Sequence, residues 1–169
     1  MRPSRKSRFT RRFNMKYYLN IGSNMGDRRD NLYRAVVALS AGNGGCAVSS
    51  IVESEPWGFE SEHRFMNLGV SLDSTMSPQQ MLDRIHEIER CLGSLSHRDD
   101  SGHYIDRLVD IDIMAIDDLV IDTPSLQVPH PHLPDREFFL LPMQQLDAAW
   151  RHPVTGLTAA QMLERLRQV

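Results

Sequence analysis

Two aspartates stand two residues apart in the stretch RLVDIDIMAID, residues 107–117. In a β-strand, residues i and i+2 point to the same face of the sheet, with side chains about 7 Å apart or less. Asp110 and Asp112 would therefore project together, while the apolar residues beside them enter the core. Two carboxylates that close repel each other unless a cation lies between them. The pair indicates a site for Mg²⁺, which prefers carboxylate oxygens and keeps substrate phosphates among its ligands.

Basic side chains near this pair favour a polyphosphate ligand. Arg98, Arg107 and Arg136 lie in or beside segments expected to be loops, and His130 lies in a Pro-rich one. Guanidinium groups bind phosphate through bidentate, charge-assisted hydrogen bonds. Three other interpretations stay open: an acidic strand that faces solvent, arginines in surface ion pairs, and a zinc half-site of His130 and His132 that lacks a convincing third ligand.

Alternating strand and helix patterns position the first half of the chain. The stretch KYYLNIG, residues 16–22, predicts a strand, and a second strand is predicted over 46–52. Between them, the GNGG segment at 42–45 ends a helix whose apolar face is formed by Leu32, Ala35, Val36 and Leu39. The polar segment EPWGFESEHR then predicts a long loop.

The second half begins with a third strand, in which Leu68, Val70 and Leu72 alternate with polar residues and glycine. The next helix is predicted to begin at Ser77, because Gln80 completes a capping box and proline occupies the first helical position. Its core-facing residues are Met81, Ile85, Ile88 and Leu92. A polar loop leads from it to the strand of the two aspartates.

The element order β-α-β-β-α-β predicts an α+β domain with a ferredoxin-like fold, in which both helices pack on one face of an antiparallel sheet. Beyond this core, the AIDDLVID segment predicts a tight turn and a short strand. A C-terminal helical extension is expected, with one helix after Arg136 and another from Thr158. We expect a single domain over residues 15–169.

Charge divides the chain of 169 residues into two parts. Residues 1–14 carry six basic and no acidic side chains, which leaves 13 basic against 22 acidic in the remainder, a formal charge of −9. We expect this tail to be disordered or not native, with Met15 as the working start; a nucleic-acid, lipid or targeting role is the alternative. The acidic body argues against a nucleic-acid-binding fold.

No apolar run approaches the roughly 20 residues of a membrane helix, so no membrane partner is expected. Cys46 and Cys91 show no metal-ligand spacing, and one disulfide between them stays open. The absence of a secreted-scaffold pattern favours a cytoplasmic protein. We expect a monomer.

Over nearly all of residues 15–169 the sequence resembles the 6-hydroxymethyl-7,8-dihydropterin pyrophosphokinases. The resemblance lies in the order and spacing of several blocks: YYLNIGSNMGDRRDNL, FMNLGVSL, DRLVDIDIMAIDDLVIDTPSLQVPHP and DREFFLLPMQQL. It implies a ferredoxin-like enzyme of folate biosynthesis that transfers a diphosphate from ATP to the hydroxymethyl group of a reduced pterin, using two Mg²⁺ ions.

The resemblance also implies roles for individual residues. Asp110 and Asp112 match the two metal-binding aspartates, and Arg107 matches a phosphate-contacting arginine, so these three form the expected catalytic set. Arg107, His130 and Arg136 match nucleotide-binding positions, and Arg98 is expected to join them in ATP binding.

On the pterin side, Phe65 and Phe138 match the two aromatic residues that sandwich the flat ring, although core packing is the alternative for each. Asn67 suits a pterin edge that needs both a donor and an acceptor. Ser54 and Trp57 fall in a loop that lines the pterin pocket in the family.

Several positions depart from the family pattern. The usual Gly-Arg-x-Arg after the second helix is replaced by Gly93-Ser94-Leu95-Ser96, and further departures are His103, Tyr104, Ser125, Gln127 and Pro131. Each missing charge-assisted contact to a triphosphate forfeits roughly 1.5–3 kcal/mol. We therefore expect a looser nucleotide site, with loop closure and catalysis more affected than ground-state binding. The alternative function is a pterin- and nucleotide-binding homologue with impaired or lost catalysis.

Overall fold

The computed structural model describes residues 14–93, 100–101 and 106–169. Several positions named above lie outside the described residues. They are residues 1–13 of the basic tail, Arg98, and the loop positions Ser94, Leu95, Ser96, His103 and Tyr104. The elements in chain order are β1 (Met15–Ser23), α1 (Arg28–Ser40), β2 (Gly44–Val48), β3 (Val52–Ser54), β4 (Phe65–Ser74), α2 (Pro78–Cys91), β5 (Asp110–Ile116), β6 (Ile121–Asp122), β7 (Gln127–Val128), the 3-10 helix η1 (Leu133–Asp135), α3 (Glu137–Leu146) and α4 (Ala159–Arg167).

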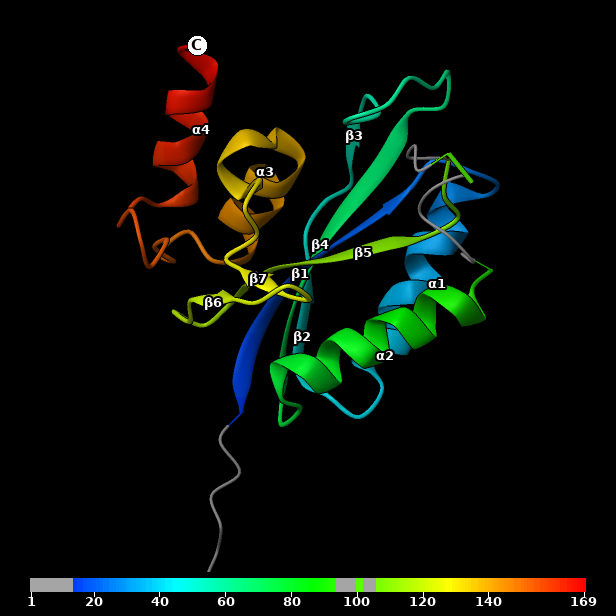
Figure 1. The fold of residues 1–169 in the computed structure, drawn as a ribbon, viewed down its shortest axis with the longest axis horizontal. Helices are drawn as coiled ribbons and strands as arrows, with labels where there is room; N and C mark the ends of the chain where they lie inside the picture. Colours follow the sequence, from blue (N-terminus) through cyan, green and yellow to red (C-terminus); the bar gives the residue numbers. More distant parts are fainter. Residues whose placement is uncertain (1–13, 94–99, 102–105) are drawn as a thin grey trace, which may run out of the picture.

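The main sheet has the strand order β2-β4-β1-β5, and β3 pairs with β4 beyond the end of β2. All of these pairings are antiparallel. The first and second predicted strands are thus separated by β4, which is the split βαβ arrangement. The predicted ferredoxin-like topology is confirmed, and Figure 1 shows α1 and α2 together on one side of this sheet.

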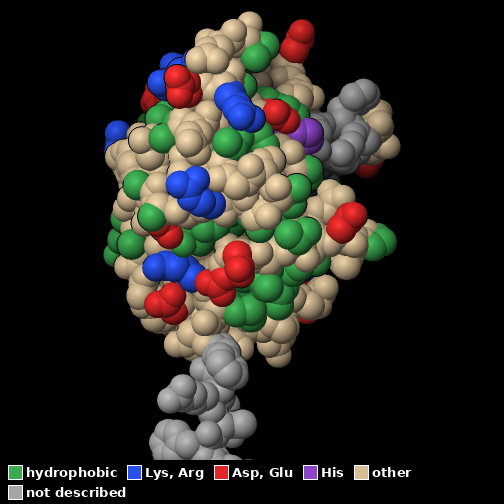
Figure 2. Space-filling model, turned by 90° about the vertical axis from the view of Figure 1, so that its left-hand side faces the viewer, with side chains coloured by type: hydrophobic (Ala, Val, Ile, Leu, Met, Phe, Trp, Pro, Cys, Tyr) green, Lys and Arg blue, Asp and Glu red, His purple; other side chains and the backbone are tan. Residues whose placement is uncertain are grey.

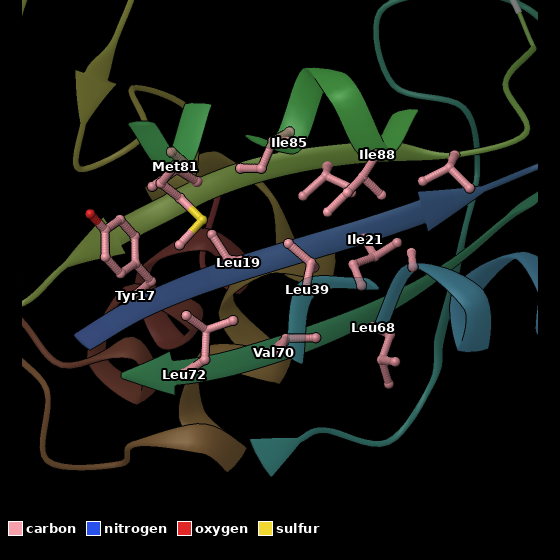
Figure 3. Packing of buried hydrophobic residues seen from close by; sticks show 14 of the residues in the cluster. Tyr17, Leu19, Ile21, Leu39, Leu68, Val70, Leu72, Met81, Ile85 and Ile88 are labelled. Atoms are coloured by element: carbon pink, nitrogen blue, oxygen red, sulfur yellow. The ribbon is translucent and has the colours of Figure 1, made fainter. Parts of the chain in front are cut away.

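The sheet is covered on both faces because alternate residues of its strands enter different cores. Tyr17, Leu19 and Ile21 of β1 pack with the apolar faces of α1 and α2 (Figure 3). Tyr18 points the other way, into a second cluster built mainly from α3 and α4. The C-terminal helical extension therefore closes the face of the sheet that the two earlier helices leave open.

Local signals place the helices where the sequence predicts them. Ser77 caps α2, and the reciprocal bonds with Gln80 form the predicted capping box. Thr158 caps α4 in the same way. At α1 the cap is Asp27, whose side chain accepts a hydrogen bond from the backbone N–H of Asp30. These caps satisfy amides that the first helical turn leaves without partners.

The strand predicted over 46–52 is divided into β2 and β3. Val48 pairs with Val70 and Val52 pairs with Asn67. The chain therefore advances four residues on the edge side while β4 advances three, which leaves one extra residue. The extra residue interrupts the ladder, as a β-bulge does, and bends the chain at that point. The bend turns β3 and the loop after it toward α3, with which β3 is in contact.

Three expectations from composition concern the cysteines, a membrane-spanning helix and the charge on the surface. Both cysteines are exposed and free, so the disulfide left open above is absent. Among the described residues no helix has the length and apolar character that a membrane crossing requires. On the side nearest α4, acidic and basic side chains are interspersed, and no basic stripe of the kind used to track nucleic acid is visible there (Figure 2).

Candidate functional site

Asp110 and Asp112 lie on the face of β5 that is turned toward α3. Their strand partners on β1 are Gly22 and Asn20, respectively. Ile111 between them points into the opposite core, as the alternation predicts. Both carboxylates line one cavity of about 290 Å³ at the end of the sheet. The two acids therefore share one concave space, as predicted.

The same cavity gathers the predicted site residues from distant parts of the chain. Apart from Arg98, which the structure does not describe, all of them line it: Ser54, Trp57, Phe65, Asn67, Arg107, Asp110, Asp112, His130, Arg136 and Phe138. Sequence reasoning missed Asn20, Gly22, Glu55 and Phe59, and it considered His132 only as a zinc ligand. Asn20 and Gly22 share the alternation that puts Tyr18 on the α3 face, which was the available signal for them.

Arg107 supplies positive charge beside the acid pair. Its side chain is 9% exposed, and its guanidinium forms an ion pair with Asp110. Burial, followed by the charge of Asp110, raises the pKa of Asp112 from 3.8 to about 7, although Arg136 and Arg107 act in the opposite direction. A cation bound between the two carboxylates would offset the cost of ionising Asp112.

His130 is brought to the acid pair by an irregularity in β5. Tyr18 pairs with Ala115 while Leu19 pairs with Ile113, which leaves Met114 as an extra residue in β5. The carbonyl of Met114 accepts a hydrogen bond from the backbone N–H of His130, 2.9 Å away. This bulge thereby holds the Pro-rich loop against the strand.

The imidazole of His130 lies among charged groups of both signs. Its Nε2 atom is 3.8 Å from Oδ1 of Asp112. Burial, then the charges of Arg136 and His132, lowers the pKa of His130 from 6.5 to about 4. The side chain is therefore neutral at physiological pH and retains one ring nitrogen as an acceptor and the other as a donor.

Aromatic residues form part of the cavity wall. Phe65 is 8% exposed and stacks edge-on with Phe59, with ring centroids 6.2 Å apart. Phe138 comes from the first turn of α3, and its backbone carbonyl accepts a hydrogen bond from Nδ2 of Asn20. The Phe65 ring is thus partly in the core and partly in the cavity, so core packing and a ligand contact are compatible there.

Asn67 differs from the expectation that its amide offers both a donor and an acceptor. Its Nδ2 atom already donates to the carbonyl of Val52, at 3.1 Å, and to Oγ of Ser54, at 2.8 Å. These two bonds use both amide hydrogens, so only Oδ1 is left for a ligand. Ser54 acts here by orienting Asn67. Ser54 reaches Asn67 because β3 pairs with β4. The single strand predicted over 46–52 ends before Ser54 and so does not include this pairing.

A second cavity, of about 330 Å³, lies on the other side of the acid pair. It shares Arg107, Asp110, Asp112 and His130 with the first. Its remaining wall comes from α2, β5 and the Pro-rich segment: Leu82, His86, Glu89, Ile111, Ile113, Ser125, Leu126, Gln127 and Pro131. The two cavities therefore meet at the two carboxylates.

Glu89 of this second cavity was not predicted. It is 3% exposed, and its Oε1 accepts a hydrogen bond from the backbone N–H of Ile111, 2.8 Å away. Since β5 is an edge strand of the main sheet, this bond satisfies an amide outside the ladder. The signal in the sequence was its position four residues after Ile85, on the apolar stripe of α2.

Carboxylate oxygens make the acid pair suited to Mg²⁺. In the described part of the chain, no three His, Cys, Asp or Glu side chains come together as a metal cluster. The zinc interpretation of His130 and His132 thus gains no third ligand from those residues. Two aspartates fit Mg²⁺ instead, because that ion keeps water and phosphate oxygens for its other positions.

Comparison with known proteins identifies the family of this chain. Residues 18–148 match the family 7,8-dihydro-6-hydroxymethylpterin-pyrophosphokinase (HPPK). The chain is 40% identical over 138 residues to a 2-amino-4-hydroxy-6-hydroxymethyldihydropteridine pyrophosphokinase of Porphyromonas gingivalis, covering 80% of this chain and 92% of that protein. It is 34% identical over 137 residues to the protein of the same name from Aquifex aeolicus, covering 81% and 83%, respectively.

Solved structures give the same result for the fold. The crystal structure of Plasmodium falciparum HPPK-DHPS is similar with a TM-score of 0.71, covering 90% of this chain and 44% of that chain. The sequence identity is 14%, so this similarity supports the architecture alone.

Proposed function

Because this chain belongs to the 7,8-dihydro-6-hydroxymethylpterin-pyrophosphokinase family, we propose that it transfers diphosphate from ATP to 6-hydroxymethyl-7,8-dihydropterin in folate biosynthesis, with release of AMP. The observation that carries this proposal is the meeting of two cavities at Asp110 and Asp112. A transfer between two substrates needs a separate space for each and a common point where the reacting groups approach.

The first cavity suits the pterin. A flat, partly aromatic ring fits between Phe65 and Phe138, since ring faces and edges attract at short range. Asn67 would accept a hydrogen bond from a ring N–H through Oδ1, its remaining polar atom. Trp57 would close the outer side. The hydroxymethyl group would then point toward the acid pair.

The second cavity suits the nucleotide. The apolar side chains of Ile113 and Leu82 would pack against the base, and the triphosphate would extend toward Arg107. His130, which is neutral, would donate a hydrogen bond to phosphate. Arg98 is proposed to add a further contact, from a segment outside the described residues. Ser125 and Gln127 stand in this wall where many family members carry a basic residue and threonine, which supports a looser nucleotide site.

In the proposed reaction, the hydroxyl oxygen of the pterin attacks the β-phosphorus of ATP and gives its proton to the Asp110 carboxylate. The bond between that phosphorus and the oxygen bridging to the α-phosphorus breaks, and this oxygen leaves on AMP. Arg107 and Arg136 would hold the diphosphate in line and offset charge that develops on it. No protein nucleophile takes part in the proposed step, so positioning by these side chains accounts for the catalysis.

Asp110 and Asp112 would hold two Mg²⁺ ions. Bound Mg²⁺ supplies charge neutralisation of the phosphates and lowers the pKa of a coordinated hydroxyl. The raised pKa of Asp112 in the free protein supports this assignment, because a cation relieves the cost of ionising it.

The direct test is AMP formation from ATP and 6-hydroxymethyl-7,8-dihydropterin with Mg²⁺, for the wild type and Asp112→Ala. We expect turnover by the wild type and a loss of at least about 100-fold in the variant. Asp83→Ala, on the exposed face of α2, is the control and should match the wild type. Turnover by Asp112→Ala at near the wild-type rate would contradict the mechanism.

A wild-type protein that makes no AMP would point to the binding homologue. Calorimetry with the pterin and with a non-hydrolysable ATP analogue separates the two functions, because the homologue binds both ligands without turnover. We further propose a cytoplasmic monomer that acts on these two small molecules without nucleic acid or membrane. Light scattering measures the oligomeric state.

A further inference from the structure

Two segments that frame the first cavity meet at a carboxylate outside it. Asp106 precedes Arg107 in the chain and does not line the cavity. Its Oδ1 atom accepts hydrogen bonds from Oγ of Ser61, at 2.6 Å, and from Nδ2 of Asn24, at 2.7 Å. Its Oδ2 atom lies 2.7 Å from Nδ1 of His63. We call these four residues, Asn24, Ser61, His63 and Asp106, the Asp106 clasp.

Asn24 extends the Asp106 clasp to the backbone of Arg107. Its Oδ1 atom accepts from the Arg107 N–H at 2.7 Å, and its own N–H donates to the Arg107 carbonyl at 3.1 Å. Its Nδ2 atom also lies 3.2 Å from the carbonyl of His63. The Asn24 side chain is 3% exposed. One enclosed amide thus joins the end of β1, the segment before β5 and the loop before β4.

The loop before β4, residues 55–64, needs such contacts. It contains no helix or strand, yet its residues Glu55, Trp57 and Phe59 line the cavity. Ordering a loop costs conformational entropy for every residue. Whether these side chains are ordered at the cavity or move away from it therefore depends on the bonds between the loop and the rest of the protein.

The charge of Asp106 strengthens those bonds. Burial opposes its ionised form, but hydrogen bonds from Ser61, His63 and Asn24 together outweigh burial and lower its pKa. Hydrogen bonds to an ionised acceptor are about twice as strong as neutral ones. The four residues of the Asp106 clasp are polar and act through hydrogen bonds, separately from the two apolar cores.

We propose that Asp106 is a positioning residue that fastens the loop of residues 55–64 to the segment carrying Arg107. The aromatic wall of the pterin cavity is thereby tied to the backbone of that segment, which Asn24 also holds at Arg107. This inference rests on the proposed function for its effect on turnover, but its effect on loop order is independent of that function.

The test compares Asp106→Ala and Asp106→Asn with the wild type. Hydrogen exchange reports loop order, and titrations give the dissociation constants of the pterin and of a non-hydrolysable ATP analogue separately. Steady-state assays give KM and kcat. Glu87→Ala is the matched control, because Glu87 also has a side-chain partner at 2.7 Å, Arg84, but lies on α2 away from the loop.

For Asp106→Ala we expect exchange to rise at least about fivefold in residues 55–64 and to stay unchanged in β1, β4 and α2. The KM for the pterin should rise about tenfold, while binary binding of the ATP analogue changes less than about twofold. For both loop exchange and the KM for the pterin, Asp106→Asn should fall between the wild type and Asp106→Ala. Its side-chain oxygen still accepts a hydrogen bond from Ser61 or Asn24. Ser61→Ala and His63→Ala should each have smaller effects and add little to Asp106→Ala.

Unchanged exchange in the loop together with a wild-type KM for the pterin would overturn the inference. Faster exchange spread evenly through the core would also overturn it, since Asp106 would then be a general stabilising residue. A wild type that forms no AMP refutes the proposed function instead, and loop exchange in Asp106→Ala still decides whether the clasp holds the loop.

Discussion

The guanidinium carbon of Arg136 lies 4.2 Å from the centroid of the Trp57 ring, and the same indole ring lies 4.6 Å from the imidazole of His132. Trp57 belongs to the loop before β4, whereas the other two belong to the segment that leads into α3. The contact therefore joins two segments of the cavity wall. It also orients Arg136, because a guanidinium stacked on an aromatic face directs its N–H groups toward the edge of the ring.

Replacing Trp57 tests this orientation. Cation–π contacts are worth about 0.5–2 kcal/mol, so Trp57→Leu should lower kcat/KM by roughly 2- to 30-fold. Trp57→Phe keeps an aromatic face and should recover part of the loss. Steady-state assays measure both. Equal activity of Trp57→Leu and the wild type would mean that the stacking does not position Arg136.

Asp112 should cost stability in metal-free buffer. Burial and Asp110 raise its pKa from 3.8 to about 7, so the folded protein retains a proton that the unfolded chain has lost above pH 4. The free energy of unfolding therefore falls as the pH rises from about 4 to 7. Asp112→Asn removes this penalty and should be more stable than the wild type by about 1–3 kcal/mol at pH 8, allowing for partial solvent screening.

Urea unfolding with a chelator present measures this difference, which should shrink toward zero near pH 4. The same variant should lose AMP formation, so stability and activity change in opposite directions. Asp83→Asn serves as the control for removing one negative charge from the surface. A less stable Asp112→Asn at pH 8 would show that the carboxylate is favourably paired in the free protein.

His130 should make the fold sensitive to acid. Burial, with the charges of Arg136 and His132, lowers its pKa from 6.5 to about 4, so between these values the unfolded chain binds a proton that the folded protein excludes. The free energy of unfolding of the wild type therefore falls as the pH falls from 6.5 toward 4, because protonation of His130 favours the unfolded chain. His130→Gln should lose less stability than the wild type between pH 7 and 4.5, by about 1–3 kcal/mol.

Denaturant titrations at several pH values measure this slope. His86→Gln, in which an exposed histidine of α2 is replaced, should run parallel to the wild type. If His130→Gln also runs parallel, then His130 titrates normally in the folded protein and is solvated more than its surroundings imply.

Gly69 allows α3 to lie close to β4. A Cβ atom at this position would be 2.5 Å from Cβ of Pro142 and 3.0 Å from a methyl group of Leu146. Gly69→Ala should therefore destabilise the protein by about 1–3 kcal/mol through overpacking. It should also raise the KM for the pterin, because α3 carries Phe138.

Thermal or urea unfolding measures the first effect. Gly44→Ala is the control, since no atom lies within 4 Å of the Cβ it would add, and its stability should change by less than about 0.5 kcal/mol. Similar stability of Gly69→Ala and the wild type would mean that α3 shifts on the sheet at little cost.

Much of the fold and of the candidate site was predictable because it depends on local spacing. Backbone geometry alone puts Asp110 and Asp112 on one face of a strand. The Ser77–Gln80 capping box begins α2 by bonds within one turn, and it is present as predicted. The ferredoxin-like order follows from the sequence of strands and helices, and the family follows from the order of motif blocks along the chain.

Other features were decided by contacts between distant segments. The division of the strand predicted over 46–52 follows from its register with β4, and the place of His130 follows from the bulge at Met114. Neither leaves a pattern in the residues themselves, because a bulge depends on how two strands are paired.

The sequence by itself determined which side chains with suitable chemistry are present and which face of a strand or helix each one occupies, since those are properties of neighbouring residues. Only the tertiary structure decided that both N–H groups of the Asn67 amide donate to Val52 and Ser54. It also decided that Trp57 stacks on Arg136 and that Asp106 joins two loops. Each of these contacts joins residues brought together by strand pairing and loop closure, whose free energy depends on the whole fold.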